Sequence, residues 1–337
     1  MTKPLLSIAI PTYKRAALLD LCLGQICKQL EQPGLVELIV SDNASPDDTP
    51  AIVKKYQDAG HKITYTRNEE NVGADRNILQ AFKMATGKYV VVFSDDDVLI
   101  EGAIDGILKL LSSGNYGIVH LNSFGFSGNY QPSAKATSVT AFVYKNKKRF
   151  IRKTNYLLTF ISGTIINKEL IGLPDYEWSL DTNLVQMSWH YKALLDASEN
   201  AYVDTKLVAV KEENTGGYNI FKVFGTHIVK VHRHFIDAGY DASYFRIVEN
   251  QMLIAFYPLW ITRLRQNQGA FTTDEGYTHL LPLYRGNLYF WLCTVPAFKL
   301  PIAVSRIGVF FCRAWKKLLI VSSDAIGKVT GDIKLQK

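Results

Sequence analysis

Cysteine is scarce in this sequence and shows no pattern. Four cysteines occur in 337 residues, and none belongs to a CxxC pair or to a nearby cluster with histidine. This excludes a small disulfide-stapled scaffold and argues against a zinc ribbon. Residues 1–4 also lack the basic-then-apolar pattern of a secretory leader, so we expect a reduced, cytoplasmic environment.

Long apolar runs and a glycine-rich phosphate loop are missing as well. The uncharged aromatic stretch 287–298 is shorter than the ~20 residues that a membrane-spanning helix needs. Residues 11–15, which follow the first apolar run, contain no glycine. A sugar-phosphate nucleotidylyltransferase would place a glycine-rich loop there, so the sequence argues against that class of enzyme.

The composition is that of a folded globular protein with a basic end. Hydrophobic residues make up 47% and charged residues 20%, and the length accommodates two domains. Residues 281–337 contain nine Lys and Arg against two Asp, which equals the whole net charge of +7. A basic end of this kind indicates either a nucleic-acid patch or an anionic membrane surface as partner.

Apolar runs alternate with helical periodicity over the first hundred residues, which predicts a mostly parallel sheet covered by helices. The expected strands are 5–10, 36–40, 63–66 and 89–93, and the expected helices are 16–29, 46–59, 74–85 and 100–111. Farther on we expect strands at 117–121, 160–166 and 201–210, a mobile loop at 122–149, and helices at 182–197, 221–238, 249–266 and 277–293.

Three adjacent carboxylates, Asp95, Asp96 and Asp97, follow the buried strand 89–93. Such a run is repulsive without a cation, and hard oxygen ligands suit Mg²⁺ or Mn²⁺ together with diphosphate oxygens. The alternative is a helix N-terminus, where aspartate caps free amides. In open α/β sheets ligands bind beyond the carboxyl ends of strands, so the loops 11–15, 41–45, 71–77 and 94–97 should converge on one edge.

Two further polar residues leave strand ends, and each has two interpretations. Asp42 is placed to accept hydrogen bonds from a nucleobase or ribose, or to form an Asx turn before the next helix. Arg76 is placed to pair with a phosphate or an acidic residue, or to remain solvated.

The stretch 6–98 resembles the nucleotide-binding half of a family 2 glycosyltransferase with the GT-A fold. The matching segments are SIAIPTYKRAALLDLCL, ELIVSDNASPDDT and NEENVGADRNILQAFKMATGKYVVVFSDDDVL. Their order and spacing make the resemblance specific over roughly the first 110 residues. The SDNAS and FSDDD segments are similar to the abequosyltransferase-like branch that builds bacterial O-antigen.

The resemblance implies roles for the residues that match. The donor-binding residues that it implies are Pro11, Thr12, Tyr13, Arg15, Asp42, Asn43, Asp75, Arg76 and Asp95. It implies Mn²⁺ or Mg²⁺ as cofactor, with Asp96 as metal ligand and Asp97 as support of the metal site. Ser94 stands where the usual DxD motif of the family has its first aspartate.

The catalytic base is implied by the resemblance at the start of a helix after the sixth strand, where the family often has a Glu-Asp pair. Residues 177–182 read EWSLDT and contain no such pair. We assign Asp181 as the carboxylate that deprotonates the acceptor hydroxyl, and Glu177 as its substitute. The alternative for Asp181 is a plain N-cap of the expected helix 182–197.

Aromatic and histidine residues near this region form a further set of candidates. Trp178 is expected either to stack on a sugar ring or to pack in the core. His227, His232 and His234 are expected to cluster on the helix 221–238 and to form a polar face or a diphosphate contact, rather than a zinc site.

The C-terminal segment combines basic and apolar residues. Lys299, Arg306 and Arg313 recur every seven residues among branched and aromatic side chains, which suits a helix lying in a membrane interface. A packed helical subdomain is the alternative. We expect Lys316 and Lys317 to meet lipid phosphates, and the apolar face argues against nucleic acid as partner.

Together these features predict an α/β GT-A glycosyltransferase with a helical, membrane-associated C-terminal region. The expected parts are a nucleotide-sugar-binding half at 1–115, an acceptor-binding half at 116–215 and a basic amphipathic region at 216–337. The resemblance implies transfer of a hexose or deoxyhexose from a nucleotide-diphosphate sugar to a polyprenyl-diphosphate-linked saccharide at the inner face of the cytoplasmic membrane. A non-catalytic nucleotide-sugar-binding or assembly scaffold is the alternative, and a homo-oligomer is left open.

Overall fold

The computed structural model describes residues 3–30, 34–132, 135–172, 176–212, 217–266, 276–325 and 332–335. Its strands are β1 (Leu6–Thr12), β2 (Val36–Asp42), β3 (Ile63–Arg67), β4 (Tyr89–Val92), β5 (Val98–Leu99), β6 (Ile118–Phe126), β7 (Val139–Tyr144), β8 (Thr164–Asn167), β9 (Asn200–Lys211) and β10 (Asp332–Leu335). In this part of the chain they form one ten-stranded sheet in the order β10-β7-β9-β6-β8-β4-β1-β2-β3, with β5 paired to β9.

The N-terminal half of the sheet is parallel, as the sequence predicts. Strand β1 pairs in parallel with β2 on one side and with β4 on the other. Its central residue Ile8 is fully buried, as are its cross-strand neighbours Leu38 and Val91, because helices cover both faces of the sheet. The register sets Thr12 beside Asp42, so the ends of β1 and β2 are level.

The other half of the sheet is mixed rather than parallel. Strand β8 runs antiparallel to both β4 and β6, while β6 and β9 are parallel neighbours. The chain reverses direction between β6 and β7, because β7 runs antiparallel to β9, which is parallel to β6.

The prediction of a mobile loop at 122–149 is wrong. Strand β6 continues to Phe126 through an irregularity at Leu121–Ser123, where the side chain of Asn122 donates to the carbonyl of Asp204. Strand β7 and helix α5 (Lys147–Thr154) follow. The lysines and arginines of α5 are half-buried, and its apolar residues Phe150 and Ile151 are fully buried.

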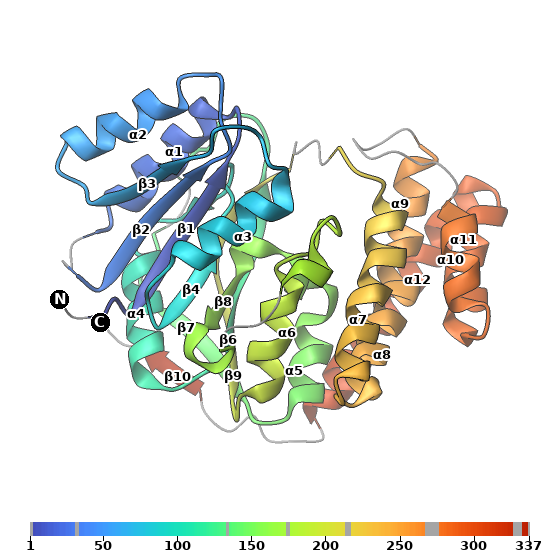
Figure 1. The fold of residues 1–337 in the computed structure, drawn as a ribbon. Helices are drawn as coiled ribbons and strands as arrows, with labels where there is room; N and C mark the ends of the chain where they lie inside the picture. The colour runs from blue at the N-terminus through green and yellow to red at the C-terminus, as the bar shows by residue number, and fades with distance from the viewer. Residues whose placement is uncertain are drawn as a thin grey trace.

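Helices cover both faces of the sheet (Figure 1). They are α1 (Ala16–Cys27), α2 (Thr49–Asp58), α3 (Ala74–Met84), α4 (Ala103–Ser113) and α6 (Met187–Asp196). Helices α1 and α4 bury Leu23 and Ile107 against one face. On the other face Phe82 of α3 stacks on Trp189 of α6, with ring centroids 4.1 Å apart.

The C-terminal region is helical, as expected, and shares its apolar core with α3 and α6. Its helices are α7 (Ile228–Asp237), α8 (Ala242–Gln251), α9 (Tyr257–Leu264), α10 (Gly276–Tyr284), α11 (Val295–Lys299) and α12 (Ile302–Ala325). Among the described residues, π-helical turns lead directly into α7, α9 and α11, at Lys222–His227, Met252–Phe256 and Phe290–Thr294. Among the described residues, we find no helix with the length and hydrophobicity required to cross a bilayer.

Candidate active site

The carboxyl ends of β1, β2 and β4 bring their loops to one edge of the sheet, as the sequence predicts. Thr12 ends β1, Asp42 ends β2, and Ser94 to Asp97 follow β4. The backbone amide of Asn43 donates to the carbonyl of Thr12 at 2.9 Å, which joins the first two loops. All these polar side chains are buried or nearly so, except Ser94, which is half-buried. The edge is therefore an organised polar site rather than a set of solvated loops.

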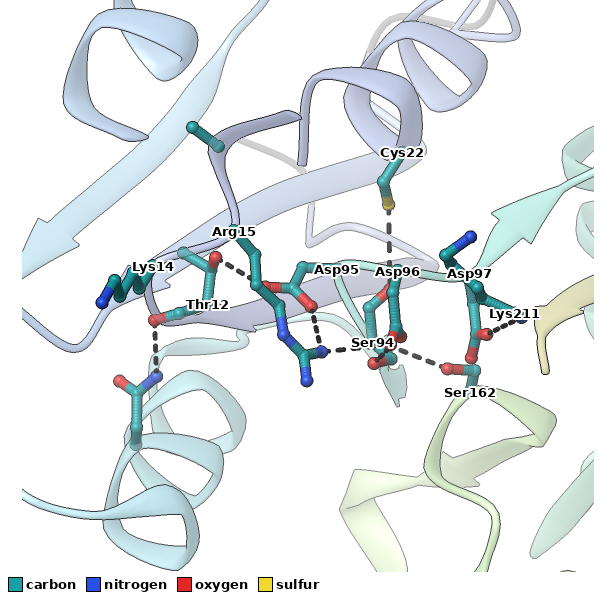
Figure 2. Close-up of polar contacts among 12 residues, drawn as sticks. Thr12, Lys14, Arg15, Cys22, Ser94, Asp95, Asp96, Asp97, Ser162 and Lys211 are labelled. Carbon is teal, nitrogen blue, oxygen red and sulfur yellow. Dashed lines mark hydrogen bonds and ion pairs between the residues drawn. The ribbon is translucent and has the colours of Figure 1, made fainter. Parts of the chain in front are cut away.

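Asp95 is fixed by the first loop. The hydroxyl of Thr12 donates to its Oδ2 at 2.6 Å, and the guanidinium of Arg15 lies 3.1 Å from its Oδ1 (Figure 2). Burial raises the pKa of Asp95 to about 6, and the nearby charge of Arg15 opposes that rise. The two carboxylate oxygens thus each have one partner from the loop after β1.

Asp96 shares the same arginine. Nη1 of Arg15 is 3.0 Å from Oδ2 of Asp96, and the hydroxyl of Ser94 donates to its Oδ1. Only 5% of the Asp96 side chain is exposed, against 35% for Arg15. One guanidinium therefore bridges two buried carboxylates, which stabilises them against mutual repulsion.

Asp97 points to different partners. Its Oδ1 accepts from the backbone amide of Lys211 at 3.3 Å (Figure 2), and the hydroxyl of Ser162 donates to the Asp97 carboxylate. Burial raises the pKa of Asp97 to about 7, and the adjacent charge of Asp96 adds to the rise. Asp97 thus ties the acidic loop to β9 and to the turn before β8.

Asp95 and Asp96 fit a divalent cation by their chemistry. Oδ1 of Asp95 and Oδ2 of Asp96 face one common cationic partner, and both are hard oxygen donors of the kind that Mg²⁺ and Mn²⁺ prefer. In the part of the chain that the structure describes, no three His, Cys, Asp or Glu side chains are grouped as a metal-binding set. The remaining ligands of an ion here would have to be water and substrate oxygens.

Asp42 lies fully buried at the end of β2. Its Oδ1 accepts from the backbone amide of Ser45 at 2.8 Å, which is the Asx-type turn expected as its alternative role. Its Oδ2 accepts from the hydroxyl of Tyr65 at 2.7 Å and lies 3.4 Å from Nε of Arg67. Burial and the bond to Asp42 raise the pKa of Tyr65.

Asn43 and Asn77 connect the loop after β2 with the start of α3 by hydrogen bonds. Asn43 donates to Oδ1 of Asn71 at 2.7 Å and to the carbonyl of Gly73 at 3.3 Å. Asn77 donates to the carbonyl of Ser41 at 3.0 Å. These bonds fix the N-terminus of α3, which begins after the positive φ of Gly73, against the end of β2.

Asp75 and Arg76 both reach across to the segment 181–185. Asp75 is 6% exposed, and its Oδ2 accepts from the backbone amide of Asn183 at 2.9 Å. Its Oδ1 is buried and has no hydrogen-bond partner among the described residues. Burial raises the pKa of Asp75. Nη1 of Arg76 lies 3.1 Å from Oδ1 of Asp181, on the surface.

The prediction that Asp181 caps or begins a helix is wrong, because the helix expected at 182–197 begins at Met187. Asp181 and Asn183 instead have φ values of 62° and 56°, and the segment between them is an irregular turn held by the bonds from Asp75 and His227. The Asp181 side chain is 77% exposed. Glu177, the other candidate base, lies exposed in a short 3₁₀ turn.

The three histidines of the C-terminal region do not form one cluster. Nδ1 of His227 contacts the carbonyl of Thr182 at 2.8 Å. His232 is buried, with Nδ1 2.6 Å from Oε1 of Glu249 and Nε2 2.9 Å from the hydroxyl of Tyr191. His234 stacks on Trp178, with ring centroids 3.7 Å apart.

Helix α12 has an apolar outer face and a polar inner contact. We define the α12 apolar face as the exposed residues Ala303, Val304, Ile307, Phe310 and Phe311.

Lys316 does not belong to that outer surface, so the expectation that it meets lipid is wrong. Its Nζ lies 3.3 Å from Oδ1 of Asn155 and 4.4 Å from the ring centre of Tyr156. Burial lowers the pKa of Lys316 to about 8, and the nearby Arg313 adds to that shift. Helical phase explains the difference, since Lys316 continues the inner row of Ser305, Val309 and Cys312.

Sequence reasoning missed several partners of the site. Tyr65 and Arg67 lie on β3, whose carboxyl end meets the same edge, so the convergence of strand ends was a usable signal for them. The backbone amide of Ser94 donates to the hydroxyl oxygen of Ser162 at 2.9 Å, and Lys211 contributes a backbone amide to Asp97. Neither has a local sequence pattern that marks it.

Comparisons with known proteins agree with this arrangement. Residues 7–171 match the sequence model described as "Glycosyl transferase family 2". The chain is 36% identical over 110 residues to abequosyltransferase RfbV of Salmonella typhimurium, which is 32% of this chain and 33% of that protein. It is 33% identical over 119 residues to the GalNAc(5)-diNAcBac-PP-undecaprenol beta-1,3-glucosyltransferase of Campylobacter jejuni, which is 35% of this chain and 37% of that protein. These matches span about a third of each relative's length.

A solved structure extends the similarity of fold to nearly the whole chain. The crystal structure of S. aureus TarS 1-349 in complex with UDP-GlcNAc aligns with a TM-score of 0.55 over 93% of this chain and 92% of that one. The sequence identity is 18%, so the likeness concerns the fold. It confirms the GT-A arrangement that the sequence predicts.

Proposed function

Residues 7–171 match glycosyl transferase family 2, and from this premise we propose that the chain transfers a hexose or deoxyhexose from a nucleotide-diphosphate sugar to a saccharide acceptor. The single observation that carries the proposal is the convergence of buried polar side chains at the ends of β1, β2 and β4. Strand ends of an open α/β sheet are where such folds bind ligands. Relatives named as an abequosyltransferase and a glucosyltransferase share this stretch of sequence.

The nucleotide is assigned to the loops after β1, β2 and β3. Pro11 and Thr12 end β1, and Tyr13 is exposed beside them, with its ring available for contact with a base. Asp42 and Asn43 hold the neighbouring loop in shape, and Asp42 is the proposed acceptor for a pyrimidine N3–H. Its bonds to Ser45 and Tyr65 fix the orientation of the carboxylate.

The diphosphate is assigned to the acidic pair and its counter-ions. Asp95 and Asp96 are the residues that would hold Mn²⁺ or Mg²⁺, and Asp97 anchors their loop through Lys211. Such an ion supplies charge stabilisation for the departing diphosphate. Arg15, and Arg76 on α3, provide further positive charge at the same edge.

The acceptor hydroxyl is assigned to the side where α3 meets the 181–185 segment. Asp181 is the proposed general base, because it is an exposed carboxylate held over the N-terminus of α3 by its ion pair with Arg76. Asp75 and His227 hold the turn that carries it. Glu177 is the substitute, in the short 3₁₀ turn that precedes this segment.

A lipid-linked saccharide is the proposed acceptor class, and the protein is proposed to bind the membrane surface peripherally. A relative whose name includes a PP-undecaprenol acceptor supports this class. The α12 apolar face supports the surface, since its Ile307, Phe310 and Phe311 are 59%, 69% and 65% exposed. The exposed Arg306 and Arg313 flank it and complement anionic headgroups.

A donor screen tests this function. UDP-, dTDP-, CDP- and GDP-sugars are incubated with the full chain, Mn²⁺ and undecaprenyl-diphosphate-linked saccharides, and the lipid product is followed by mass spectrometry. We expect one nucleotide-diphosphate sugar to yield a product larger by one hexose or deoxyhexose. Stabilisation by a nucleotide sugar with no transfer to any acceptor would instead support the non-catalytic binding protein.

A further inference from the structure

The guanidinium of Arg15 contacts the two oxygens of Asp95 and Asp96 to which no neighbouring hydroxyl donates. Thr12 donates to Oδ2 of Asp95, and Ser94 donates to Oδ1 of Asp96. The other two oxygens, Oδ1 of Asp95 and Oδ2 of Asp96, lie 3.1 and 3.0 Å from the same Nη1 of Arg15. Each carboxylate is therefore fixed on one side by a hydroxyl and closed on the other by one shared cation.

A divalent ion and Arg15 need the same pair of oxygens. If Asp95 and Asp96 held Mn²⁺ or Mg²⁺, the ion would compete for the oxygens that Nη1 of Arg15 contacts, because a divalent ion and a guanidinium repel strongly where little water screens them. Asp95 and Asp96 are only 3% and 5% exposed, so loss of Arg15 without a replacement cation would leave two buried carboxylates uncompensated. Protonation of Arg15 is permanent, so the arginine must move rather than lose its charge.

We propose that Arg15 is an exchangeable counter-ion, which neutralises Asp95 and Asp96 in the free protein and yields their oxygens to the divalent ion that enters with the nucleotide diphosphate. This inference rests on the proposed function, because the diphosphate is what the displaced guanidinium would bind. A guanidinium matches phosphate oxygens with two parallel hydrogen bonds. As the donor binds, the guanidinium of Arg15 would thus exchange its contacts with Asp95 and Asp96 for contacts with the diphosphate leaving group.

The structure allows the Arg15 side chain to move while the backbone stays in place. The carbonyl of Arg15 accepts from the amides of Leu18 and Leu19 at 3.0 Å, which is the first turn of α1. On either side, the amide of Lys14 donates to Ser45 and the amide of Ala16 donates to Asp47. The side chain itself is 35% exposed, so it has a solvent-facing path out of the pair.

The exchange makes two predictions of opposite sign, which a merely structural ion pair does not. Without nucleotide, removing the competing charge with Arg15→Gln should tighten Mn²⁺ binding by roughly tenfold or more. With UDP present, the same variant should weaken the Mn²⁺-dependent binding of UDP by roughly tenfold, because the diphosphate loses its guanidinium.

Electron paramagnetic resonance of free Mn²⁺ measures the first effect, and calorimetric titration of UDP with and without Mn²⁺ measures the second. Arg67→Gln is the matched control, since it removes one guanidinium from the same edge but one that pairs with Asp42 instead. We expect Arg67→Gln to leave Mn²⁺ affinity within about threefold of wild type, because a more distant charge acts through screening solvent.

Several results would overturn the exchange. The exchange is contradicted if Arg15→Gln binds Mn²⁺ as tightly as wild type or more weakly. It is also contradicted if Arg67→Gln gains as much Mn²⁺ affinity as Arg15→Gln, or if no variant binds Mn²⁺. The donor screen decides the proposed function separately. If Arg15→Gln does not fold, Arg15→Lys decides. A lysine lacks the planar fork and is the weaker competitor, so tighter Mn²⁺ binding than wild type supports the exchange and unchanged or weaker binding contradicts it.

Discussion

At the scale of single residues, the acidic loop shows how one environment gives adjacent aspartates different tasks. Asp95 and Asp96 face Arg15, whereas Asp97 faces Ser162 and Lys211. Their identity and their position after a buried strand could be predicted from the sequence. Their division could not, because the partners of Asp97 come from residues 65 and 114 positions farther along the chain.

The preference of the protein for one nucleobase over another tests the proposed role of Asp42 in nucleotide binding. In Asp42→Asn one acceptor oxygen becomes an amide donor, which opposes the N3–H of uracil and suits the N3 acceptor of cytosine. We expect UDP binding to weaken by roughly 1–3 kcal/mol and the preference for UDP over CDP to fall, as measured by calorimetric titration. Tyr65→Phe is the control, since it removes a partner of Asp42 and leaves the carboxylate. The same change of preference in Tyr65→Phe, or tighter binding of GDP than of either pyrimidine nucleotide, would contradict the assignment.

Two buried imidazoles give a pH dependence of stability. Burial lowers the pKa of His120 to about 3 and that of His190 to about 4. The unfolded chain binds protons near its ordinary pKa of about 6.5, while the folded chain does not until the pH is much lower. Protonation therefore favours unfolding below about pH 6.5, and this loss of stability grows as the pH falls toward the folded pKa.

His120→Leu isolates one of these contributions. The stability of wild type relative to this variant should fall by about 2 kcal/mol between pH 7 and 5. Urea unfolding at both pH values measures it, and taking the difference cancels the opposite contribution of Asp95 and Asp97, whose pKa values burial raises. A difference that does not change with pH would show that His120 binds a proton equally well in the folded and the unfolded protein.

At the scale of elements, α3 joins the nucleotide side of the site to the acceptor side. Its Asn77 bonds to the end of β2, its Asp75 bonds to the amide of Asn183, and its Arg76 pairs with Asp181. The helix itself follows from its apolar spacing and could be predicted from the sequence. The turn that it holds could not, since the non-glycine positive φ values of Asp181 and Asn183 depend on these long-range bonds.

Asp75→Asn tests that connection. A neutral amide oxygen accepts more weakly from the backbone amide of Asn183 than a carboxylate does, so the turn should be held less firmly. We expect kcat to fall by roughly tenfold or more while the affinity for the nucleotide sugar stays within about twofold, because the change acts on the acceptor side. Asp105→Asn, on the exposed face of α4, is the matched control.

Measured donor affinity and turnover together decide the role of Asp75. An equal loss of donor affinity and turnover would show that Asp75 acts in binding the donor rather than on the acceptor side. Unchanged turnover would show that the turn keeps its position without this carboxylate.

At the scale of the whole molecule, the parallel half of the fold and the motif loops followed from local pattern, because each strand there is a continuous apolar run. The mixed half could not be predicted in this way. The sequence of β7 has only a weak strand pattern and that of α5 is basic, so their structure depends on the pairing of β7 with β9 and the packing of α5 on α8. The C-terminal helices were predictable in kind, but their sharing of one core with α3 and α6 was not.

The α12 apolar face predicts how the molecule meets a membrane. Full-length protein should sediment with anionic liposomes at low salt and be partly released at high salt, since exposed charges are screened over ~10 Å at 0.1 M. The double change Phe310→Ser and Phe311→Ser should reduce sedimentation severalfold. Leu35→Ser, which alters an exposed leucine at the other end of the chain, is the control. Equal binding to neutral and anionic vesicles, or none to either, would contradict a charged lipid surface as partner.

Asp96→Asn tests whether the acidic pair at the end of β4 serves glycosyl transfer. The measurement is the rate of product formation from the donor identified by the screen, with Asp105→Asn as a variant of equal charge change and circular dichroism as a check of folding. If the acidic pair serves transfer, the rate of product formation should fall by at least about a hundredfold in Asp96→Asn while the protein still folds, and Asp105→Asn should keep the wild-type rate. A folded Asp96→Asn protein that transfers sugar at the wild-type rate would contradict it.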